Sequence, residues 1–557
     1  MAQQLYFSRD TRMFVQFRNT TDNTEAAADL GKGALWEIPV LDGYSFSQTT
    51  NTSEIALSEM ESSAGVSRRG RRMFTDSLAP AEWSFSTYAR PFKSLAGGAA
   101  TGTKAADTAA EVHAVEEVLW ASMFGADKYN GNNFVRNVQP IGGADAAVLT
   151  AGVQAVGSVL SIAESNRSAM HSFTLWFLID TATANPLLYR MPEAVVNEAS
   201  VDFDVDGIAT INWSGFAKEV QDNSAKVAIS TTATPATNTG RIDGTAMVIG
   251  DMVVNTGNTR AVYLVNAISA GNAIPAPTQA IDEAITSTSN FIRNRLTGVS
   301  IEAADAADKV AGVFPGQYAV VSAVNTTTNT VTTSTSHNFS AGDQVYITGV
   351  SGTTELNGTH NFAGAVTATT FRLYTSNALA VSGHATTGIV GLTNAWTSST
   401  GTVANGQYNL TLTGGSFNLG NNITYLVPEE LGAINKPLEH VTGTRTATGN
   451  ATCYLTLEDT DTTNGTSRQF FNDLVGTGAM SKVVNKFKVT MDVGGTAAAA
   501  DEVNPALSII FPTAHIEVPS HSIEDVISLE TTFTALPTDF GAADEITSVT
   551  YKAPATY

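Results

Sequence analysis

Cysteine is nearly absent from this chain of 557 residues, in which Cys453 is the single example. One thiol excludes an intrachain disulfide and a metal centre built from several thiolates. A protein without disulfides suits assembly in a reducing cytosol. No stretch approaches ~18 consecutive apolar residues, and the N-terminus lacks a charged segment followed by an apolar one. We therefore expect neither a membrane-spanning helix nor export through a cleaved signal.

Positive charge is also scarce. Lysine and arginine total 30 against 52 aspartates and glutamates, which gives a net charge of −22. Because phosphate binding needs cationic side chains, this balance argues against a protein that wraps nucleic acid. An acidic surface repels a polyanion, which is a useful property in a channel through which DNA must slide without sticking. Solubility alone is the alternative explanation for the charge.

The composition predicts an all-β protein of more than one domain. Only 15% of the residues are charged, against ~25% in typical soluble proteins. Thr, Ser, Asn, Gly and Ala take their place, and Thr together with Val suits strands better than helices. The length exceeds the ~250 to 300 residues at which a single core stops growing.

The first part of the chain contains a recognisable series of elements. Its helix is predicted from Val112, Val115, Leu119 and Met123, which form one apolar stripe closed by Gly125. The series comprises a strand at 12–19, a pair of strands at 35–51 bent at Asp42-Gly43, a strand at 81–92, the helix within 111–125, a strand at 172–180 and a three-strand meander from Pro186 to Ala217.

The second part repeats this series in the same order. The matching segments are 291–302, 408–426 with a bend at Gly414-Gly415, 445–458, a shorter helix at 467–476, 485–493 and 505–537. Pro505 and Pro512 are placed like Pro186 and Pro192. We therefore predict two tandem β-sandwich folds, each with one flanking α-helix, that arose by duplication.

These segments define the expected domains. The first copy spans 1–220, and 221–287 is a linker or a small hairpin region. The second copy is discontinuous, at 288–314 and 400–557. A separate β module, a small barrel or sandwich, occupies 315–395 and contains turn signals such as Asn357-Gly358. Whole domains are inserted at exposed loop tips, so we expect this module on the outer surface of whatever the repeated fold builds.

The inserted module resembles a known family. Residues 337–362, HNFSAGDQVYITGVSGTTELNGTHNF, and 369–374, TTFRLY, resemble the module of phage structural proteins that is similar to the FCCH domain of ubiquitin-activating enzymes. The resemblance implies a virion component. It implies no ubiquitin chemistry, because the rest of such an enzyme is absent.

The two repeated copies resemble the fold of bacteriophage tail tube proteins, in which two packed antiparallel sheets carry one flanking helix and a long loop between early strands. A duplicated fold is similar to the tube proteins of T5-type siphophages. That resemblance implies a structural, non-enzymatic major tail protein. It further implies homotrimers with pseudo-sixfold symmetry, forming pseudo-hexameric rings that stack into a conduit for DNA ejection, although a ring of six chains stays open.

The same resemblance implies the partners and the location. The partners would be further copies of the chain, the tape measure protein, the tail terminator and tip proteins, and DNA that passes through the lumen without adhering. Membrane binding is not expected. The protein would lie in the tail of the virion after assembly in the host cytoplasm, and whether a contractile sheath surrounds the tube is left open.

Two groups of residues are candidates for a role in assembly. Arg68, Arg69, Arg71 and Arg72 stand together in a long polar loop, where we predict an inter-ring contact with an acidic face; a solvated loop is the alternative. Asp202, Asp204 and Asp206 alternate with apolar residues and predict the exposed acidic face of a strand, a candidate lining for the lumen.

We assign no catalytic, cofactor-binding or metal-binding residue. The segment 97–104, GGAATGTK, has Thr103-Lys104 where a phosphate loop requires Lys followed by Ser or Thr. The segment 202–207 resembles the start of a calcium loop, but Trp213 occupies the position of the bidentate Glu. Two competing functions are a multidomain β adhesin and a capsid decoration protein, each binding host-surface glycans.

Overall fold

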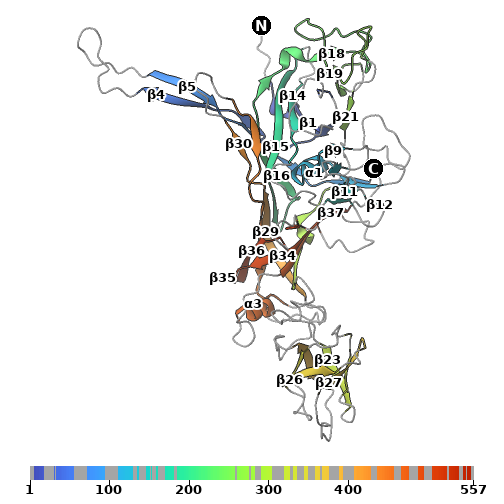
Figure 1. Cartoon of the computed structure of the whole chain (residues 1–557), viewed down its shortest axis with the longest axis vertical. Coiled ribbons are helices and arrows are strands. Elements are labelled where there is room, and N and C mark those ends of the chain that lie inside the picture. The colour runs from blue at the N-terminus through green and yellow to red at the C-terminus, as the bar shows by residue number, and fades with distance from the viewer. Residues whose placement is uncertain are drawn as a thin grey trace, which may run out of the picture.

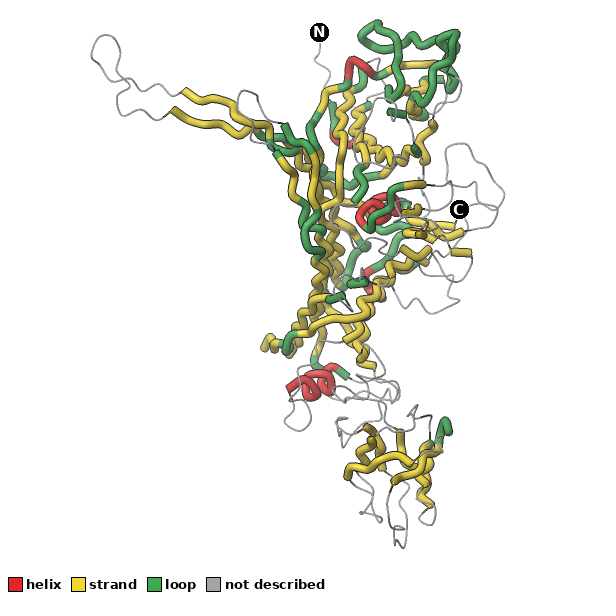
Figure 2. Tube along the Cα trace, in the orientation of Figure 1, coloured by secondary structure: helices red, strands yellow, loops and turns green. Residues whose placement is uncertain are grey.

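The fold is described from a computed structural model. It describes residues 6–17, 30–31, 33–55, 72–93, 111–129, 134–136, 146–150, 152–153, 158–160, 170–180, 185–257, 260–274, 278–282, 290–303, 319–325, 330–334, 336, 344–348, 358–363, 367–374, 388–392, 407–427, 436–456, 466–475, 487–494, 505–523, 526–537, 544–546 and 548–552. Strands dominate these residues, as Figure 2 shows, and the all-β prediction is confirmed.

One continuous antiparallel sheet, here called the long sheet, runs through both halves of the chain. Seven of its strands pair one after another, and two further strands pair with the last of the seven. The order is β3 (Ser45–Ser47), β6 (Ala81–Tyr88), β16 (Thr210–Ala217), β15 (Leu187–Asp204), β29 (Gln407–Gly420), β32 (Thr446–Tyr454), β36 (Ile527–Ala535), then β34 (Ala506–Ile516) and β35 (Ser520–Ile523).

A second layer covers the long sheet in each half. In the first half its order is β2 (Ala34–Ile38), β1 (Thr11–Phe17), β14 (Phe173–Ile179) and the start of β15. In the second half the order is the start of β29, β22 (Gly298–Ala303), β33 (Phe487–Val493) and the start of β34. The pairing pattern therefore repeats, element by element.

The two halves bend at equivalent prolines. In β15, Pro192 lies where the pairing with β14 shifts between Phe173 and Leu175. In β34, Pro512 lies where the pairing with β33 shifts between Phe487 and Val489. Such bulges bend a strand and let it pass from one sheet to another. Each long strand therefore belongs to the second layer before its proline and to the long sheet after it.

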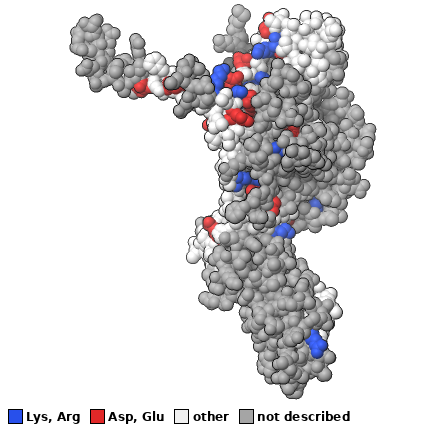
Figure 3. Space-filling view, viewed as in Figure 1, with Lys and Arg blue, Asp and Glu red and all other residues white. Residues whose placement is uncertain are grey.

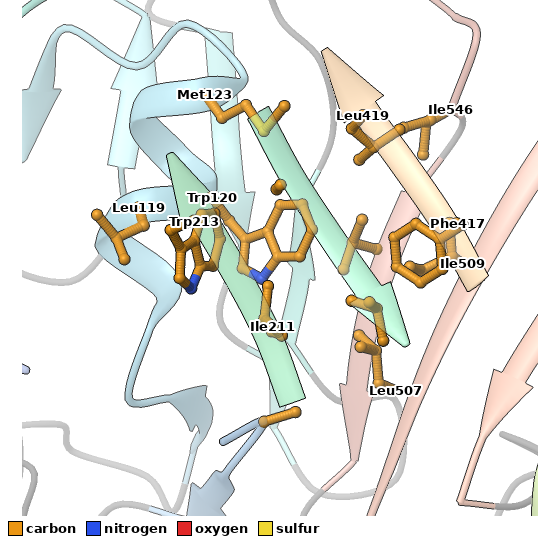
Figure 4. Packing of buried hydrophobic residues seen from close by; sticks show 14 of the residues in the cluster. Leu119, Trp120, Met123, Ile211, Trp213, Phe417, Leu419, Leu507, Ile509 and Ile546 are labelled. Atoms are coloured by element: carbon orange, nitrogen blue, oxygen red, sulfur yellow. The ribbon is translucent and has the colours of Figure 1, made fainter. Parts of the chain in front are cut away.

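One hydrophobic core lies between the layers and extends through both halves. Figure 4 shows part of this core, with Trp120 of helix α1 (Glu117–Met123) and Trp213 of β16 toward one side and Phe417 of β29 and Ile509 of β34 toward the other. The rings of Trp120 and Trp213 meet edge to face, with centroids 4.8 Å apart. The two halves thus share one hydrophobic core and are not separate domains joined by a linker.

Three predicted elements differ from the structure. Val112 lies in strand β8 (Glu111–Ala114) and Val115 in the turn before α1, rather than in the helix. The segment of Val112 pairs with β7 (Pro91–Lys93) and is buried on every side. The expected three-strand meander from Pro186 is two strands, since β15 continues through its bulge. The pair of strands expected at 408–426 is the single strand β29, followed by the short β30 (Thr424–Leu426).

The residues after the first copy pack against it. Strands β18 (Ala228–Ser230), β19 (Met252–Asn255), β20 (Val262–Leu264) and β21 (Thr278–Asp282) pair in that order, and β21 pairs with β2 in parallel. Val227, Met252 and Leu264 share a hydrophobic cluster with Phe14 and Trp176. This unit covers the face of the second layer that points away from the main core.

The inserted segment forms a closed barrel. Its strands are β23 (Ala319–Asn325), β24 (Thr330–Thr333), β27 (Thr370–Tyr374), β26 (Gly358–Ala363), β25 (Gln344–Thr348) and β28 (Gly388–Leu392), in that order around the barrel. Figure 1 shows it at the end of the molecule that also carries α3 (Ser467–Val475), the helix of the second half.

The long sheet contains aromatic rings that lie over glycines, and this packing leads to a prediction. A methyl group at Gly449 would lie 2.4 Å from Cζ of Phe533. We expect Gly449→Ala to destabilise the fold by about 1–3 kcal/mol, because overpacked cores must shift. The thermal unfolding midpoint should fall by several degrees. Gly271→Ala, where a methyl group meets nothing within 4 Å, is the control; equal midpoints for the two variants would contradict the packing described.

Candidate assembly surface

One face of the long sheet is polar from edge to edge. Its other face holds buried aromatic and aliphatic side chains such as Trp83, Trp213 and Phe417. On the polar face, directly opposed residues form a ladder that crosses both halves of the chain. The ladder consists of Ser86, Asn212, Ser200, Asn418, Thr448, Thr534 and His515.

Neither lysine nor arginine occupies this face at the described strand positions. Hydroxyl and amide side chains dominate it, and its charges are carboxylates. The carboxylates are Glu82, Glu198, Asp202, Asp204 and Glu530. A surface of this kind is wetted by water and repels polyanions.

The aspartates predicted to form an acidic face lie partly on this surface. Asp202 and Asp204 are exposed on the polar face of β15, and Asp202 accepts a hydrogen bond from Nδ2 of Asn212 at 3.0 Å. Asp206 is exposed in the turn that follows β15. Within the described part of the chain, no group of three or more His, Cys, Asp or Glu side chains is placed to hold a metal ion.

The long sheet has an open edge at each end. Within the described residues, β3 pairs with β6 alone and β35 pairs with β36 alone. Beside β35 lie exposed apolar side chains, among them Ile523, which is 80% exposed, Val526 and Tyr454. Open edges that carry apolar residues are sites for pairing with another chain.

A hairpin arm, which follows β3 in the chain, projects from the body (Figure 1). It consists of β4 (Thr50–Ile55) and β5 (Arg72–Leu78). Met73 and Phe74 on β5 are each 61% exposed. Arg72, the last residue of the predicted arginine cluster, is the first residue of β5 and pairs with Ile55. Arg68, Arg69 and Arg71 lie outside the described residues.

Charged side chains gather where the arm joins the body (Figure 3). The side chain of Gln48 donates hydrogen bonds to the carbonyl oxygens of Ala79 and Lys218. Lys218 forms a 2.9 Å ion pair with Glu193. These contacts fix the base of the arm.

The C-terminal strand ties the two halves together. Strand β37 (Ser548–Lys552) pairs with β34 of the second half and with β13 (Ser158–Leu160) of the first. Tyr551 donates a hydrogen bond to Oε1 of Glu116 at 2.5 Å and accepts one from Nε1 of Trp120 at 2.8 Å. The three side chains are fully buried.

Burial raises the pKa of Glu116 to about 7, because the ionised carboxylate has lost its water; the hydrogen bond from Tyr551 acts in the opposite direction. Burial also raises the pKa of the Tyr551 hydroxyl well above its ordinary value, and the carboxylate of Glu116 adds to this. Sequence reasoning missed this tie, since its partners lie more than 400 positions apart.

Two further observations concern helices that could span a membrane and the single cysteine. No helix in the described part of the chain is long and apolar enough to cross a membrane. The Cys453 thiol is buried, which raises its pKa to about 12 and leaves it almost entirely protonated at neutral pH.

The chain is similar to a phage tail protein. It is 35% identical over 141 residues to the tail tube protein pb6 of Escherichia phage T5, a match that covers 25% of this chain and 28% of that protein. The chain thus spans about a quarter of the length of the curated relative that it matches. No family model matches the chain. The resemblance to tube proteins of the T5 type is confirmed by this similarity, whereas the resemblance of the inserted module to the FCCH domain stays a prediction.

The Glu116 tie predicts a pH dependence of stability. The pKa of Glu116 is higher in the folded state than its ordinary value of 4.5, so the folded state binds the proton more tightly. Stability from this group is greatest below pH ~4.5 and is lost as the pH rises to ~7, by about 3 kcal/mol in all.

Glu116→Gln should abolish this loss, because the amide does not ionise and its oxygen can still accept the Tyr551 hydrogen bond. The difference in unfolding midpoint between variant and wild type should therefore grow in favour of the variant from pH 5 to pH 8. Glu82→Gln, on the exposed face, is the control and should track the wild type. A constant difference for Glu116→Gln across this range would show that the carboxyl does not titrate as described.

Proposed function

We propose that this chain is the building block of a phage tail tube, in which copies close their long sheets into a ring lined by the polar face. The similarity to the T5 tail tube protein supports the tail tube role. The ring is supported by a geometric observation. Within the described residues, one sheet runs through both halves and has one polar face and two open edges.

Closing the sheets of neighbouring copies into one barrel removes both open edges. With about 24 strand positions from three copies, spaced ~4.8 Å apart and tilted by ~40°, the barrel backbone has a diameter of about 50 Å. A DNA duplex fits within it. A trimer with pseudo-sixfold symmetry is therefore the ring that we propose, and head-to-tail contacts that close in this way give rings.

The polar face suits the wall of a DNA conduit. Asp202, Asp204 and the other carboxylates repel phosphates, and hydroxyl side chains keep the wall hydrated. Because phosphate contacts by Lys and Arg dominate affinity for DNA, a wall without them lets DNA pass without adhering. The unit of β18 to β20 lies beyond the second layer and faces outward in such a ring.

The domain proposal follows from this arrangement. Residues 1–220 and the discontinuous 288–314 and 400–557 form the two tube folds, and 315–395 forms a module that decorates the outer surface. We propose no enzymatic activity. The partners are other copies of the chain, the tape measure protein and the terminator and tip proteins, in the tail of a virion assembled in the host cytoplasm.

Labelling of introduced cysteines with small and large maleimides tests which face of the long sheet lines the lumen of the tube. Thr448 is exposed on the polar face, and Ala270 is exposed on the unit that comprises β18 to β21, here called the outer unit. We expect Thr448→Cys in assembled tubes to react with a small maleimide but not with one coupled to a protein wider than the channel, whereas Ala270→Cys reacts with both. Reaction of Thr448→Cys with the large reagent would place the polar face outside.

Electron microscopy of the same samples provides the complementary measurement. Hollow rings and tubes with three chains per ring are the expected result. Single particles that bind glycans would instead support an adhesin or a decoration protein.

The arginine cluster is the proposed contact between rings. Changing Arg68, Arg69, Arg71 and Arg72 to Glu should leave soluble rings that no longer stack, because like charges would then face one another across the ring boundary. Changing the four to Lys keeps the charge and should keep the stacking. Tubes of unchanged length from the Glu variant, measured by microscopy, would remove the cluster from the ring boundary.

A further inference from the structure

We propose that the seam between the two halves inside the chain is repeated between chains, so that β35 of one copy pairs with β3 of the next in the register by which β15 pairs with β29. This inference rests on the proposed function, which brings copies together in a ring. It adds the partner surface and the residues that meet there.

The bulges fix which residues of the two halves are equivalent. Each bulge is followed by an alanine opposite a phenylalanine: Ala194 opposite Phe173, and Ala514 opposite Phe487. Counting on from these, Val196 opposes Gly215 and Ile516 opposes Phe533. The halves therefore superpose strand by strand through β16 and β36.

The sequence beside the seam supports the same superposition. Residues 43–47 read GYSFS and residues 414–418 read GGSFN. Ser45 opposes Ser84 in the first half, and Ser416 opposes Asn450 in the second. Strand β3 is thus the equivalent of the second part of β29.

The internal seam is an antiparallel pairing of β15 with that part of β29. Ser200 opposes Asn418, and Asp202 opposes Ser416. Within the first half, Ser200 also opposes Asn212 and Asp202 opposes Thr210. Each residue of β15 is therefore placed by neighbours on both sides.

The same neighbours identify the equivalents on the open edge. Ser520 opposes Glu530, and Ser522 opposes Ser528, which are the equivalents of Asn212 and Thr210. Ser520 and Ser522 therefore stand where Ser200 and Asp202 stand. Carried to the β3 edge of the next copy, the register sets Ser520 opposite Ser47 and Ser522 opposite Ser45.

The exposed apolar residue of this edge acquires a partner in the same register. Ile523 takes the place of Phe203, which opposes Gly415 in the internal seam. The residue equivalent to Gly415 is Tyr44. The internal seam joins a large ring to a glycine, and the seam between chains joins a tyrosine to the exposed isoleucine.

The arm is the counterpart of the hairpin that closes the internal seam. After β29, β30 pairs with β31 (Glu439–Val441) and lies against the first half. Tyr425 donates a hydrogen bond to the carbonyl oxygen of Glu193, and Nε2 of His440 lies 3.1 Å from the carbonyl oxygen of Met170.

The first half continues from β3 into the β4–β5 arm, as the second continues from β29 into that hairpin. In the single chain the arm projects from the body, with Met73 and Phe74 exposed. If β3 pairs with β35 of the next copy in this register, the arm contacts that copy where its β34 pairs with β36.

Cysteine pairs test the register in the assembled full-length protein. Ser45→Cys together with Ser522→Cys should form disulfides between chains under mild oxidation, giving dimers and closed trimers on a denaturing gel. The native Cys453 is buried with a raised pKa and stays out of the reaction. Ser45→Cys with Ser528→Cys is the control, because Ser528 lies one strand further from the edge on the same face.

The outcomes separate the register from the proposed function. Rings in which the Ser45 and Ser522 pair cross-links and the control does not are the expected result. Rings seen by microscopy without this cross-link would overturn the register while the tube function stands. Protein that forms neither rings nor cross-links, with the wild type also remaining single, would overturn both.

A variant of the arm gives a second measurement. Met73→Ser with Phe74→Ser should raise several-fold the protein concentration needed for ring formation, followed by light scattering. Val248→Ser changes a residue that is 50% exposed on the outer unit and should leave that concentration unchanged. An unchanged value for the arm variant would exclude the arm from the seam.

Discussion

The structure depends on satisfying the backbone hydrogen bonds at the edges of the long sheet. Inside the chain, β15 and β29 satisfy each other's backbone hydrogen bonds. Their pairing joins one sheet of each half into the long sheet, and both halves share a single core. Among the described residues, β3 and β35 each keep one edge without a strand partner. An exposed strand edge is a template for another chain, so in the proposed ring the same fold would also specify how the next copy is added.

The bulges at Pro192 and Pro512 make this arrangement possible. A proline has no N–H group to donate, so within sheets it is found at bulges and edges. Here it marks the corner at which one long strand leaves the second layer and enters the long sheet. In each half, one long strand therefore belongs to both layers. The same backbone fixes the position of the second layer relative to the long sheet.

The sequence predicted the repeated order of elements because the signals of each element are local. Glycine bends, prolines and the alternation of Trp83 and Phe85 with serines all mark elements without reference to distant partners. The predicted helix was too long because Val112 is apolar in a segment buried on every side, where spacing does not distinguish strand from helix. The β15–β29 seam and the Tyr551–Glu116 tie join residues hundreds of positions apart, and no local pattern encodes such pairings.

Carrying two folds in one chain changes the energetics of a ring. Association of separate molecules costs translational and rotational freedom at each new contact, whereas a contact between linked parts forms at a high effective concentration. In the proposed ring, the internal seam forms during folding, so only every second seam would have to be made between molecules. The two halves are then free to diverge. The first carries the long arm beside β3, and the second carries the inserted barrel between β22 and β29, at a position where the repeated fold tolerates a whole extra domain.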